Sequence, residues 1–414
     1  MESDGPQVSI GDDAIPRLLR FCTETDRRRL LLVADGNTFA ALGARVEKSL
    51  REDGCDVTSI VLVSDEVRAD ARHILRVLLA CDRTDRTFLA VGSGTITDIT
   101  RFVSHRTGSS LVVVPTAPSV DGFTSMGAPL IVEGIKTTAI AHAPLAIFAN
   151  LETLSSAPPR MIAACFGDML GKYTSVADWR LGSLLWGLPY NDGIAQRSLR
   201  AVQSCAEKVE AIAAATSRGV RILMEALIES GFCMLDFGSS VPASGAEHHY
   251  SHYWEMALLR DGKPAILHGA RVGVATILAA GLYERIRRLS GSQAADLLRR
   301  SRLPAREEEV RRIRAAYGRR ADDVIATQDT FLSLSEVEFQ KLKSRIQDRW
   351  PEIQEIAAQV PSPARLTELL AAVGGPTEVR DLGLTEYDRE MVASSSHYLS
   401  AHFTVCRLIG ILTP

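Results

Sequence analysis

Histidines gather in one part of the chain. Four of the nine lie between residues 248 and 268. His248 and His252 are four residues apart in SGAEHHYSHYWEM, a segment of helical character, so they project from one face of the predicted helix. His268 begins the next predicted helix, and a loop between the helices would return it towards the first pair. Imidazole binds zinc, nickel and iron(II), so the pattern predicts a metal site. A structural or surface histidine cluster is the alternative.

A carboxylate would complete a three-ligand set and leave coordination positions open for substrate. Asp168 is one candidate, because it lies in the apolar helical segment AACFGDMLGKY, where an unpaired charge is costly. The alternative role of Asp168 is an ion pair with Lys172, one turn along the helix. Lys172 is also a candidate to bind a substrate phosphate. The residues leave other candidate carboxylates open: Glu247, Glu255 and Asp178.

A glycine turn follows a predicted buried strand in AVGSGTITD. Gly92 and Gly94 lie where the strand turns into a helix, so the backbone can approach a pyrophosphate and the free N–H groups of the helix can attract its charge. Asp98 is a candidate to support that turn. The run departs from the strict dinucleotide fingerprint. An ordinary tight turn is therefore the alternative.

A second polar loop, PTAPSVDGFTS, leaves the next buried strand. It carries Thr116, Ser119, Asp121, Thr124 and Ser125. Ligands of open parallel sheets bind outside the carboxyl ends of the strands. Both loops are therefore predicted to face a dinucleotide.

Asp35 ends the first of the predicted strands. An acidic side chain there is placed to accept the hydroxyls of the adenosine ribose, and it would repel the 2′-phosphate of NADP. This position favours NAD over NADP. The alternative is a turn aspartate before Gly36.

The elements that carry these residues change period along the chain. Residues 28–150 alternate between strands and amphipathic helices, which predicts a mostly parallel sheet covered on both faces, with a hairpin and one further strand in 128–150. From Pro158 onward the pattern is helical. The sequence predicts an α/β Rossmann-like domain over residues 1–155 and an all-helical domain over residues 156–414.

Composition limits the class of protein. A chain of 414 residues favours two domains, and 46% hydrophobic with 23% charged residues is typical of globular proteins. A net charge of −3 argues against a nucleic-acid partner. No apolar stretch reaches the roughly 18 residues of a membrane helix. The polar, acidic beginning predicts no secretory signal, and the seven cysteines form no CxxC pair, so we expect reduced thiols in the cytoplasm.

Four segments carry a resemblance to a known family: VPTAPSVDGFTS, SAPPRMIAACFGDMLGKYTSVADWRL, SGAEHHYSHYWEM and LHGARVGV. In this order they resemble the bacterial sn-glycerol-1-phosphate dehydrogenases, of the superfamily of iron-containing alcohol dehydrogenases, glycerol dehydrogenases and dehydroquinate synthases. The resemblance runs through roughly residues 30–280 and more weakly through the C-terminal helices. It implies a Rossmann-like domain, a helical domain, an active site in the cleft between them, and a homodimer. It also implies a zinc, nickel or iron ion.

Carried over residue by residue, the resemblance implies that Asp168, His248 and His268 are the metal ligands. It matches Asp121 and His252 to positions that contact the glycerol moiety, and together with Lys172 these are the predicted catalytic residues. The predicted cofactor contacts lie in the two loops and at the end of the first strand. They are Asp35, Gly92, Gly94, Thr95, Ile96, Thr97, Asp98, Thr116, Ala117, Pro118, Ser119 and Ser125.

The predicted reaction is the reduction of dihydroxyacetone phosphate by NAD(P)H to sn-glycerol 1-phosphate, with the metal as a Lewis acid on the carbonyl. Alternatives are a different phosphorylated or polyol carbonyl, a cyclase or lyase of the dehydroquinate-synthase kind, and a non-catalytic binding protein.

Three departures from the family bear on the substrate. Asn150 replaces the usual Asp, Ala270 replaces a Glu, and the tail SAHFTVCRLIG replaces an RxRYT-like segment.

Overall fold

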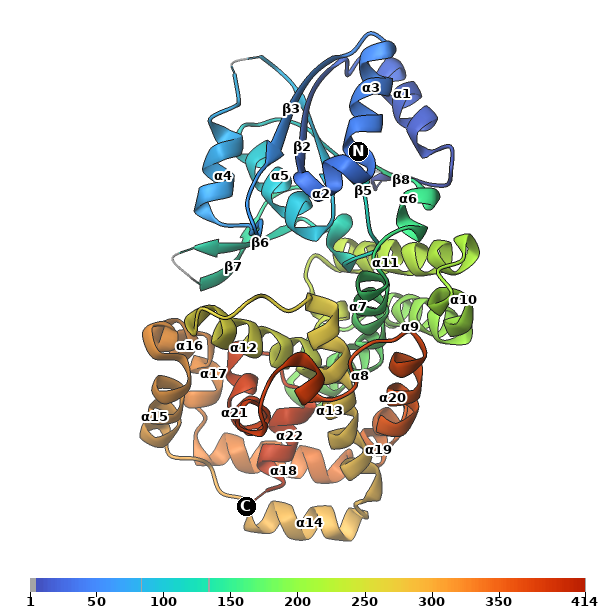
Figure 1. Ribbon diagram of the computed structural model, residues 1–414. Coiled ribbons are helices and arrows are strands. Elements are labelled where there is room, and N and C mark those ends of the chain that lie inside the picture. Colours follow the sequence, from blue (N-terminus) through green and yellow to red (C-terminus); the bar gives the residue numbers. More distant parts are fainter. Residues whose placement is uncertain (1–4, 83, 133–134, 414) are drawn as a thin grey trace. The chain divides into compact units, whose positions relative to one another are not determined.

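The computed structural model describes residues 5–82, 84–132 and 135–413. The chain forms two compact units, each made of two segments (Figure 1). The first unit contains Met1–Met169 and Gln203–Gly238, and the second contains Leu170–Val202 and Ser239–Pro414. The prediction placed a single boundary at 155/156, and the compact units do not follow it. That boundary, and the interdomain cleft implied by the resemblance, stay predictions.

The first unit is built on a parallel sheet. Within the described residues its strand order is β1-β8-β5-β4-β2-β3, and every neighbouring pair is parallel. The strands are β1 (Gln7–Ile10), β2 (Arg29–Asp35), β3 (Asp56–Leu62), β4 (Thr87–Gly92), β5 (Leu111–Pro115) and β8 (Ala146–Ala149). All residues of β4, β5 and β8 are buried, as expected for strands covered on both faces. The predicted parallel sheet is confirmed.

Helices cover both faces of this sheet (Figure 1). Helices α1 (Ala14–Glu24) and α3 (Ala44–Glu52) pack on one face, where Leu18 and Val46 join Leu32 and Val91 in one apolar cluster. Alternate strand residues such as Leu31 point to the other face. That face carries α4 (Ala71–Leu78) and α5 (Gly94–Arg106).

Several local features of this unit go beyond the prediction. Strand β1 and helix α1 lie before residue 28, ahead of the predicted alternation of strands and helices. Between β2 and β3 the chain forms the short α2 (Gly36–Thr38), then a π-helical segment, Phe39–Gly43, and then α3. The predicted hairpin is confirmed as the antiparallel pair β6 (Gly127–Val132) and β7 (Ile135–Ile140).

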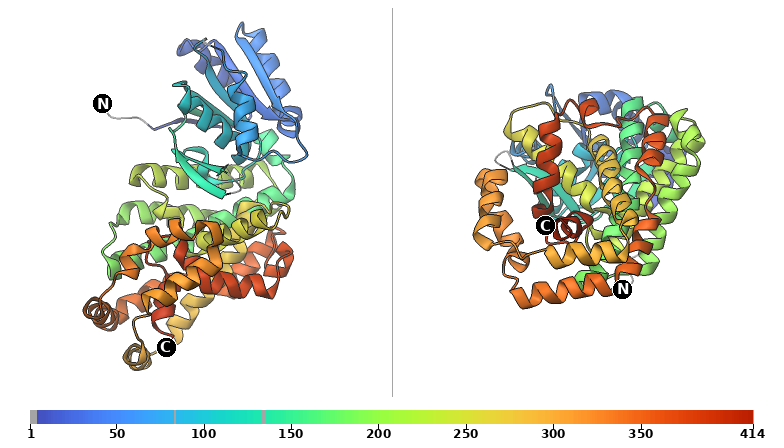
Figure 2. Two further views of the ribbon diagram at one scale, coloured as in Figure 1. Left: turned by 90° about the vertical axis from the view of Figure 1, so that its left-hand side faces the viewer. Right: turned by 90° about the horizontal axis from the view of Figure 1, so that it is seen from below.

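Every regular element after Pro158 in the described residues is a helix, as predicted (Figure 2). The first unit gains α6 (Leu151–Ser155), α10 (Val209–Ala213) and α11 (Ser217–Phe237). Helices α7 (Pro159–Leu170) and α9 (Asp192–Glu207) cross the unit boundaries. No helix in the part of the chain that the structure describes is long and apolar enough to cross a membrane.

The second unit is arranged around α13 (His268–Arg288), which packs against α12 (Ala246–Arg260) and also against α19 (Trp350–Gln359), α20 (Pro363–Ala372) and α22 (Val405–Ile411). Helix α8 (Lys172–Trp186) contacts both α12 and α13. Other helices complete the second unit in the described residues. They are α14 (Gly291–Arg300), α15 (Arg306–Tyr317), α16 (Ala321–Thr327), α17 (Asp329–Leu332), α18 (Glu336–Asp348), α19 (Trp350–Gln359), α20 (Pro363–Ala372), α21 (Glu386–Ser395) and α22 (Val405–Ile411).

Candidate active site

The sheet topology marks a ligand-binding edge in the first unit. Strand β2 lies between β3 and β4, so the chain order reverses between β2 and β4. Open α/β sheets bind ligands outside the carboxyl ends of the strands at such a reversal. Asp35 ends β2 and Gly92 ends β4. Two of the predicted cofactor segments therefore lie at the expected edge.

The glycine turn after β4 is tightly packed. A Cβ on Gly92 would lie 2.6 Å from the Ile96 Cβ, and one on Gly94 would lie 3.0 Å from the Val120 side chain. Helix α5 begins at Gly94, whose N–H donates to the Ser119 hydroxyl at 3.3 Å. A hydrogen bond therefore connects the turn with the loop after β5, and the N-terminus of α5 lies at the turn.

The first turn of α5 carries the other predicted cofactor contacts of this segment. Ile96 and Thr97 are buried, Thr95 is partly buried, and the Thr97 hydroxyl donates to the Ser93 carbonyl. Asp98 accepts from Arg101 at 3.2 Å. Burial raises the pKa of Asp98 to about 7, against the opposing charge of Arg101. Asp98 is thus paired with Arg101, and its support of the glycine turn stays a prediction.

The loop after β5 starts with buried residues, Thr116, Ala117 and Pro118. The Ser125 hydroxyl further along accepts the Gly127 N–H at 2.9 Å. Between them lies the 3-10 turn Asp121–Phe123. These positions lie in one continuous loop, and their contact with a cofactor stays a prediction.

Arg101 holds this loop in place through hydrogen bonds, and it was not predicted from the sequence. It is fully buried and donates to the carbonyls of Gly122 and Phe123 at 2.8 Å each and of Gly127 at 3.0 Å. A buried charge needs such bonds to offset its desolvation. These three carbonyls lie more than twenty residues away along the chain, so no local pattern indicated them.

Helix α11 also contacts this loop. The Ser230 hydroxyl donates to Asp121 Oδ2 at 2.9 Å. A Cβ on Gly231 would lie 1.8 Å from the Thr124 Oγ1 and 2.7 Å from the Asp121 carbonyl oxygen. Only glycine permits this approach, so Ser230 and Gly231 determine where Asp121 lies. The sequence analysis did not identify either residue.

Asp35 has a local role in the structure. Its Oδ1 accepts the Thr38 N–H at 2.8 Å, and the Thr38 hydroxyl accepts the Asp35 N–H at 2.9 Å, which forms a capping box at the start of α2. The turn role considered in the sequence analysis is therefore present. The ribose contact stays a prediction.

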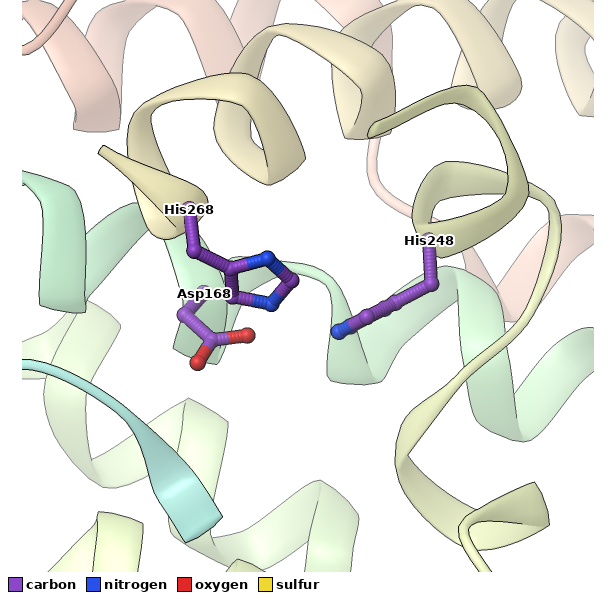
Figure 3. A group of neighbouring side chains, drawn as sticks. All are labelled: Asp168, His248 and His268. Atoms are coloured by element: carbon purple, nitrogen blue, oxygen red, sulfur yellow. The ribbon is translucent and has the colours of Figure 1, made fainter. Parts of the chain in front are cut away.

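The three predicted metal ligands come together (Figure 3). Asp168 lies near the end of α7, His248 in the first turn of α12, and His268 at the first residue of α13. One ligand atom from each lies within 4.8 Å of the others. Asp168 is fully buried and His248 nearly so, and the side chains point towards one another in Figure 3. A buried carboxylate with two imidazoles is a donor set that suits a divalent zinc, nickel or iron ion.

The other carboxylates considered as ligands have different partners. Glu255 forms an ion pair with the buried Arg271 at 2.9 Å. Asp178 accepts the N–H groups of Ala246 and Val405, at 2.7 and 2.6 Å, and so caps α12 and α22. Burial and the nearby charge of Glu247 raise the pKa of Asp178 to about 7.

Glu247 lies behind His248. Its Oε1 is 2.8 Å from His248 Nδ1 and accepts the Gly245 N–H at 2.7 Å, while its Oε2 accepts the Thr174 hydroxyl at 2.6 Å. Burial by itself raises the pKa of Glu247. The hydrogen bonds from His248, Thr174 and Gly245 outweigh burial and hold that pKa below its usual value.

His252 and Lys172 are the remaining predicted catalytic residues. The His252 ring centroid is 5.9 Å from that of His248 and 5.8 Å from that of His268, so it lies beside the ligand group. Lys172 is fully buried at the start of α8, and its Nζ donates to the Ala243 carbonyl at 3.2 Å. The catalytic roles of both residues stay predictions.

All three departures from the family include a buried residue. Asn150 is buried and caps α6, accepting the Thr153 N–H at 3.0 Å and Arg45 at 2.9 Å. Ala270 is buried in the first turn of α13. In the tail, Phe403 is buried and stacks on Trp186.

Comparisons with known proteins extend this picture. Residues 9–158 match the sequence model of the family described as iron-containing alcohol dehydrogenase. A protein of Geobacillus thermodenitrificans named glycerol-1-phosphate dehydrogenase (NAD(P)+) is 37% identical over 396 residues, which cover 95% of this chain and 89% of that protein. The protein of the same name from Bacillus subtilis is 42% identical over 283 residues, covering 68% of this chain and 72% of its own.

Solved structures agree on the fold. A probable glycerol dehydrogenase from Sinorhizobium meliloti superimposes with a TM-score of 0.63 at 17% identity, covering 99% of this chain and 96% of that one. An alcohol dehydrogenase from Oenococcus oeni gives a TM-score of 0.65 at 14% identity, covering 99% and 97%. At these identities the likeness shows the fold alone, and it confirms the predicted fold class.

Proposed function

Because the chain belongs to the glycerol-1-phosphate dehydrogenase family, we propose that it reduces dihydroxyacetone phosphate to sn-glycerol 1-phosphate with NAD(P)H, and catalyses the reverse oxidation. The observation that carries the proposal in this chain is the group of Asp168, His248 and His268, of which Asp168 and His248 are buried. Similarity over 95% of this chain supports the reaction, and the ligand group supports the metal chemistry that the reaction needs.

The chemistry of the bound groups is simple to state. A divalent zinc, nickel or iron ion held by these three residues would polarise the ketone oxygen as a Lewis acid, and NAD(P)H would supply the hydride. The carboxylate of Asp168 contributes one negative charge to the ligand set, and the neutral imidazoles contribute none. The set therefore leaves a net positive charge at the site, which favours a developing alkoxide.

The substrate is oriented, in this proposal, by the chain's own polar side chains. Asp121, fixed by Ser230, accepts a hydroxyl of the glycerol moiety. His252, beside the ligand group, transfers the proton between the alkoxide oxygen and solvent. Lys172 supplies positive charge for the phosphate. The role of His252 is supported by the closeness of its ring to those of His248 and His268. The role of Lys172 is supported by its burial in the second unit, which also contains His252.

The cofactor is assigned to the carboxyl edge of the sheet. The N-terminus of α5 and the glycine turn receive the pyrophosphate, while the loop from Thr116 to Ser125 lies along the rest of the dinucleotide. Asp35 accepts a ribose hydroxyl and favours NADH over NADPH. We also propose, with the family resemblance as support, that the protein works as a homodimer in the cytoplasm.

The proposal is tested by NADH and NADPH oxidation in the presence of dihydroxyacetone phosphate and of a panel of other phosphorylated and free ketones. Metal-stripped protein is used, with zinc, nickel and iron added back singly. We expect metal-dependent oxidation that is fastest with dihydroxyacetone phosphate. A different preferred ketone would move the proposal to another substrate of the same scaffold. Product formation with no net change in NADH would contradict it in favour of a cyclase.

A further inference from the structure

A chain of buried polar groups lies behind one metal ligand, entirely within the second unit. It runs from the Thr174 hydroxyl on α8 to the Glu247 carboxylate and on to the His248 imidazole on α12. Thr174 and Glu247 are fully buried. The two contacts are 2.6 and 2.8 Å long, which is the range of strong hydrogen bonds to a charged acceptor.

The Glu247 carboxylate is held in one place. Its Oε1 accepts the Gly245 N–H at 2.7 Å, and a Cβ on Gly245 would lie 3.0 Å from its Oε2. The Thr174 hydroxyl also lies 3.0 Å from the Gly171 carbonyl, but its contact with the carboxylate is shorter and charge-assisted. Backbone and hydroxyl donors thus fix the acceptor that faces His248.

This arrangement has a consequence for the imidazole. A neutral histidine has one N–H, and the nitrogen without it is the one that can bind a metal. An ionised carboxylate accepts but does not donate, so its contact with Nδ1 requires the proton on Nδ1. The lone pair is then on Nε2, and Figure 3 shows a His248 ring nitrogen directed towards Asp168 and His268.

We propose that Glu247 and Thr174 are positioning residues of the metal centre, which hold His248 in the tautomer and orientation that present Nε2 to the metal. The inference rests on the proposed function only in requiring that a metal binds at Asp168, His248 and His268. Glu247 orients the ring directly. Thr174 acts through Glu247.

The competing role is purely structural. Glu247 also bonds the backbone N–H at the start of α12, so it could serve the helix end alone. In that case its replacement would lower stability and leave metal affinity unchanged. The experiment must therefore read metal binding separately from both stability and turnover.

The test uses metal-stripped protein and zinc, with the dissociation constant measured by competition with a chromophoric chelator. Glu247→Gln keeps the shape of the side chain and removes its charge. We expect zinc to bind about 10- to 100-fold more weakly, as is typical when a residue that orients a ligand is changed. Absorption of the cobalt-substituted protein reports the ligand geometry, and its visible spectrum should change in this variant.

A second pair of variants isolates the hydroxyl. Thr174→Val removes it with little change of shape, and we expect at least about threefold weaker zinc binding. Thr174→Ser retains the hydroxyl and should restore the wild-type value. The matched control is Thr276→Val on α13, a fully buried threonine whose hydroxyl donates only within its own helix, to Val272 at 2.8 Å. It should leave the zinc constant unchanged.

The outcomes separate this inference from the proposed function. Unchanged zinc binding in both Glu247→Gln and Thr174→Val, with a lower melting temperature, would overturn the positioning role and leave the dehydrogenase proposal standing. Failure of the wild-type protein to bind zinc, nickel or iron would instead contradict the metal-dependent function. Equal loss in Thr174→Ser and Thr174→Val would also overturn the role of the hydroxyl.

Discussion

The loops at the carboxyl ends of β4 and β5 and the ligand-bearing helices α12 and α13 are built in different ways. The loops are shaped by backbone: a glycine turn, a helix N-terminus, and carbonyls held by Arg101. The helices instead present buried side chains, and a further layer of side chains orients them. Changes in the first region should therefore act through packing and shift binding, whereas changes in the second should remove the chemistry itself.

The largest effect is expected from loss of a metal ligand. His268→Ala should abolish metal retention and lower kcat/KM for dihydroxyacetone phosphate by about 1,000-fold or more, because several kcal/mol of charge stabilisation are lost. Metal content and steady-state kinetics measure this. His105→Ala, on α5 outside the ligand group, is the control. Full activity with stoichiometric metal in His268→Ala would break the assignment.

A large effect is also expected where α11 meets the Asp121 loop. In Gly231→Ala the new methyl group would overlap Thr124 and the Asp121 carbonyl, so the loop must shift, at a cost of about 1–3 kcal/mol. We expect a raised KM for both substrates with metal content unchanged. Gly281→Ala on α13, where a Cβ meets nothing within 4 Å, is the matched control and should be neutral or slightly stabilising. Wild-type kinetics in Gly231→Ala would show that the loop position does not matter.

A moderate effect is expected at the end of β2. Asp35→Ser retains a residue that can cap α2 but removes the carboxylate, so stability should change by less than about 1 kcal/mol. If Asp35 accepts the ribose hydroxyls, KM for NADH rises by about tenfold while KM for NADPH is little changed or falls. Kinetics with both cofactors measure this. Equal, unchanged values would leave Asp35 with its capping role alone.

The smallest effect is expected on stability at low pH. We expect the loss of stability on acidification to arise mainly from the second unit. Burial, with the charge of Arg407, holds the pKa of His397 well below its ordinary value. The unfolded chain then takes up a proton before the folded one does, so the stability that the neutral ring contributes is complete above about pH 6.5 and is lost as the pH falls below it. His397→Gln should therefore lose less of its melting temperature than wild type between pH 7.5 and pH 5.5.

His142→Gln provides the counterpart in the first unit. Burial also lowers the pKa of His142, whereas the pKa of His397 lies well below its ordinary value. The variant should flatten the pH dependence less than His397→Gln does. The reverse order, from the same melting curves, would contradict the assignment of acid sensitivity to the second unit.

Most strands of the sheet, and the change from strands to helices, could be predicted from the sequence. Buried parallel strands are apolar runs, so β2, β4 and β5 were identified from the sequence, as was the partly buried β3, and the change of period at Pro158 marked the helices. Strand β1 was missed because its four residues, QVSI, are short and only partly buried. The glycine turn was correctly placed because only glycine suits that packing.

The site was predictable only in part. The histidine spacing indicated a metal site, but choosing among four carboxylates depended on how α7, α12 and α13 pack, which no local pattern contains; the family resemblance made the choice. Ser230 and Asp121 are 109 residues apart along the chain, so their contact was likewise out of reach. The sequence offered Glu247 as a possible metal ligand. Only the structure shows that its carboxylate instead contacts His248 Nδ1.

The central claim is that one metal ion at Asp168, His248 and His268 is required for ketone reduction. It is tested most directly by titrating metal-stripped protein with zinc, nickel or iron while following NADH oxidation with dihydroxyacetone phosphate. The account predicts no activity without metal and a linear rise that breaks at one ion per chain. Full activity in the metal-stripped protein, or activity that ignores the added ion, would contradict it.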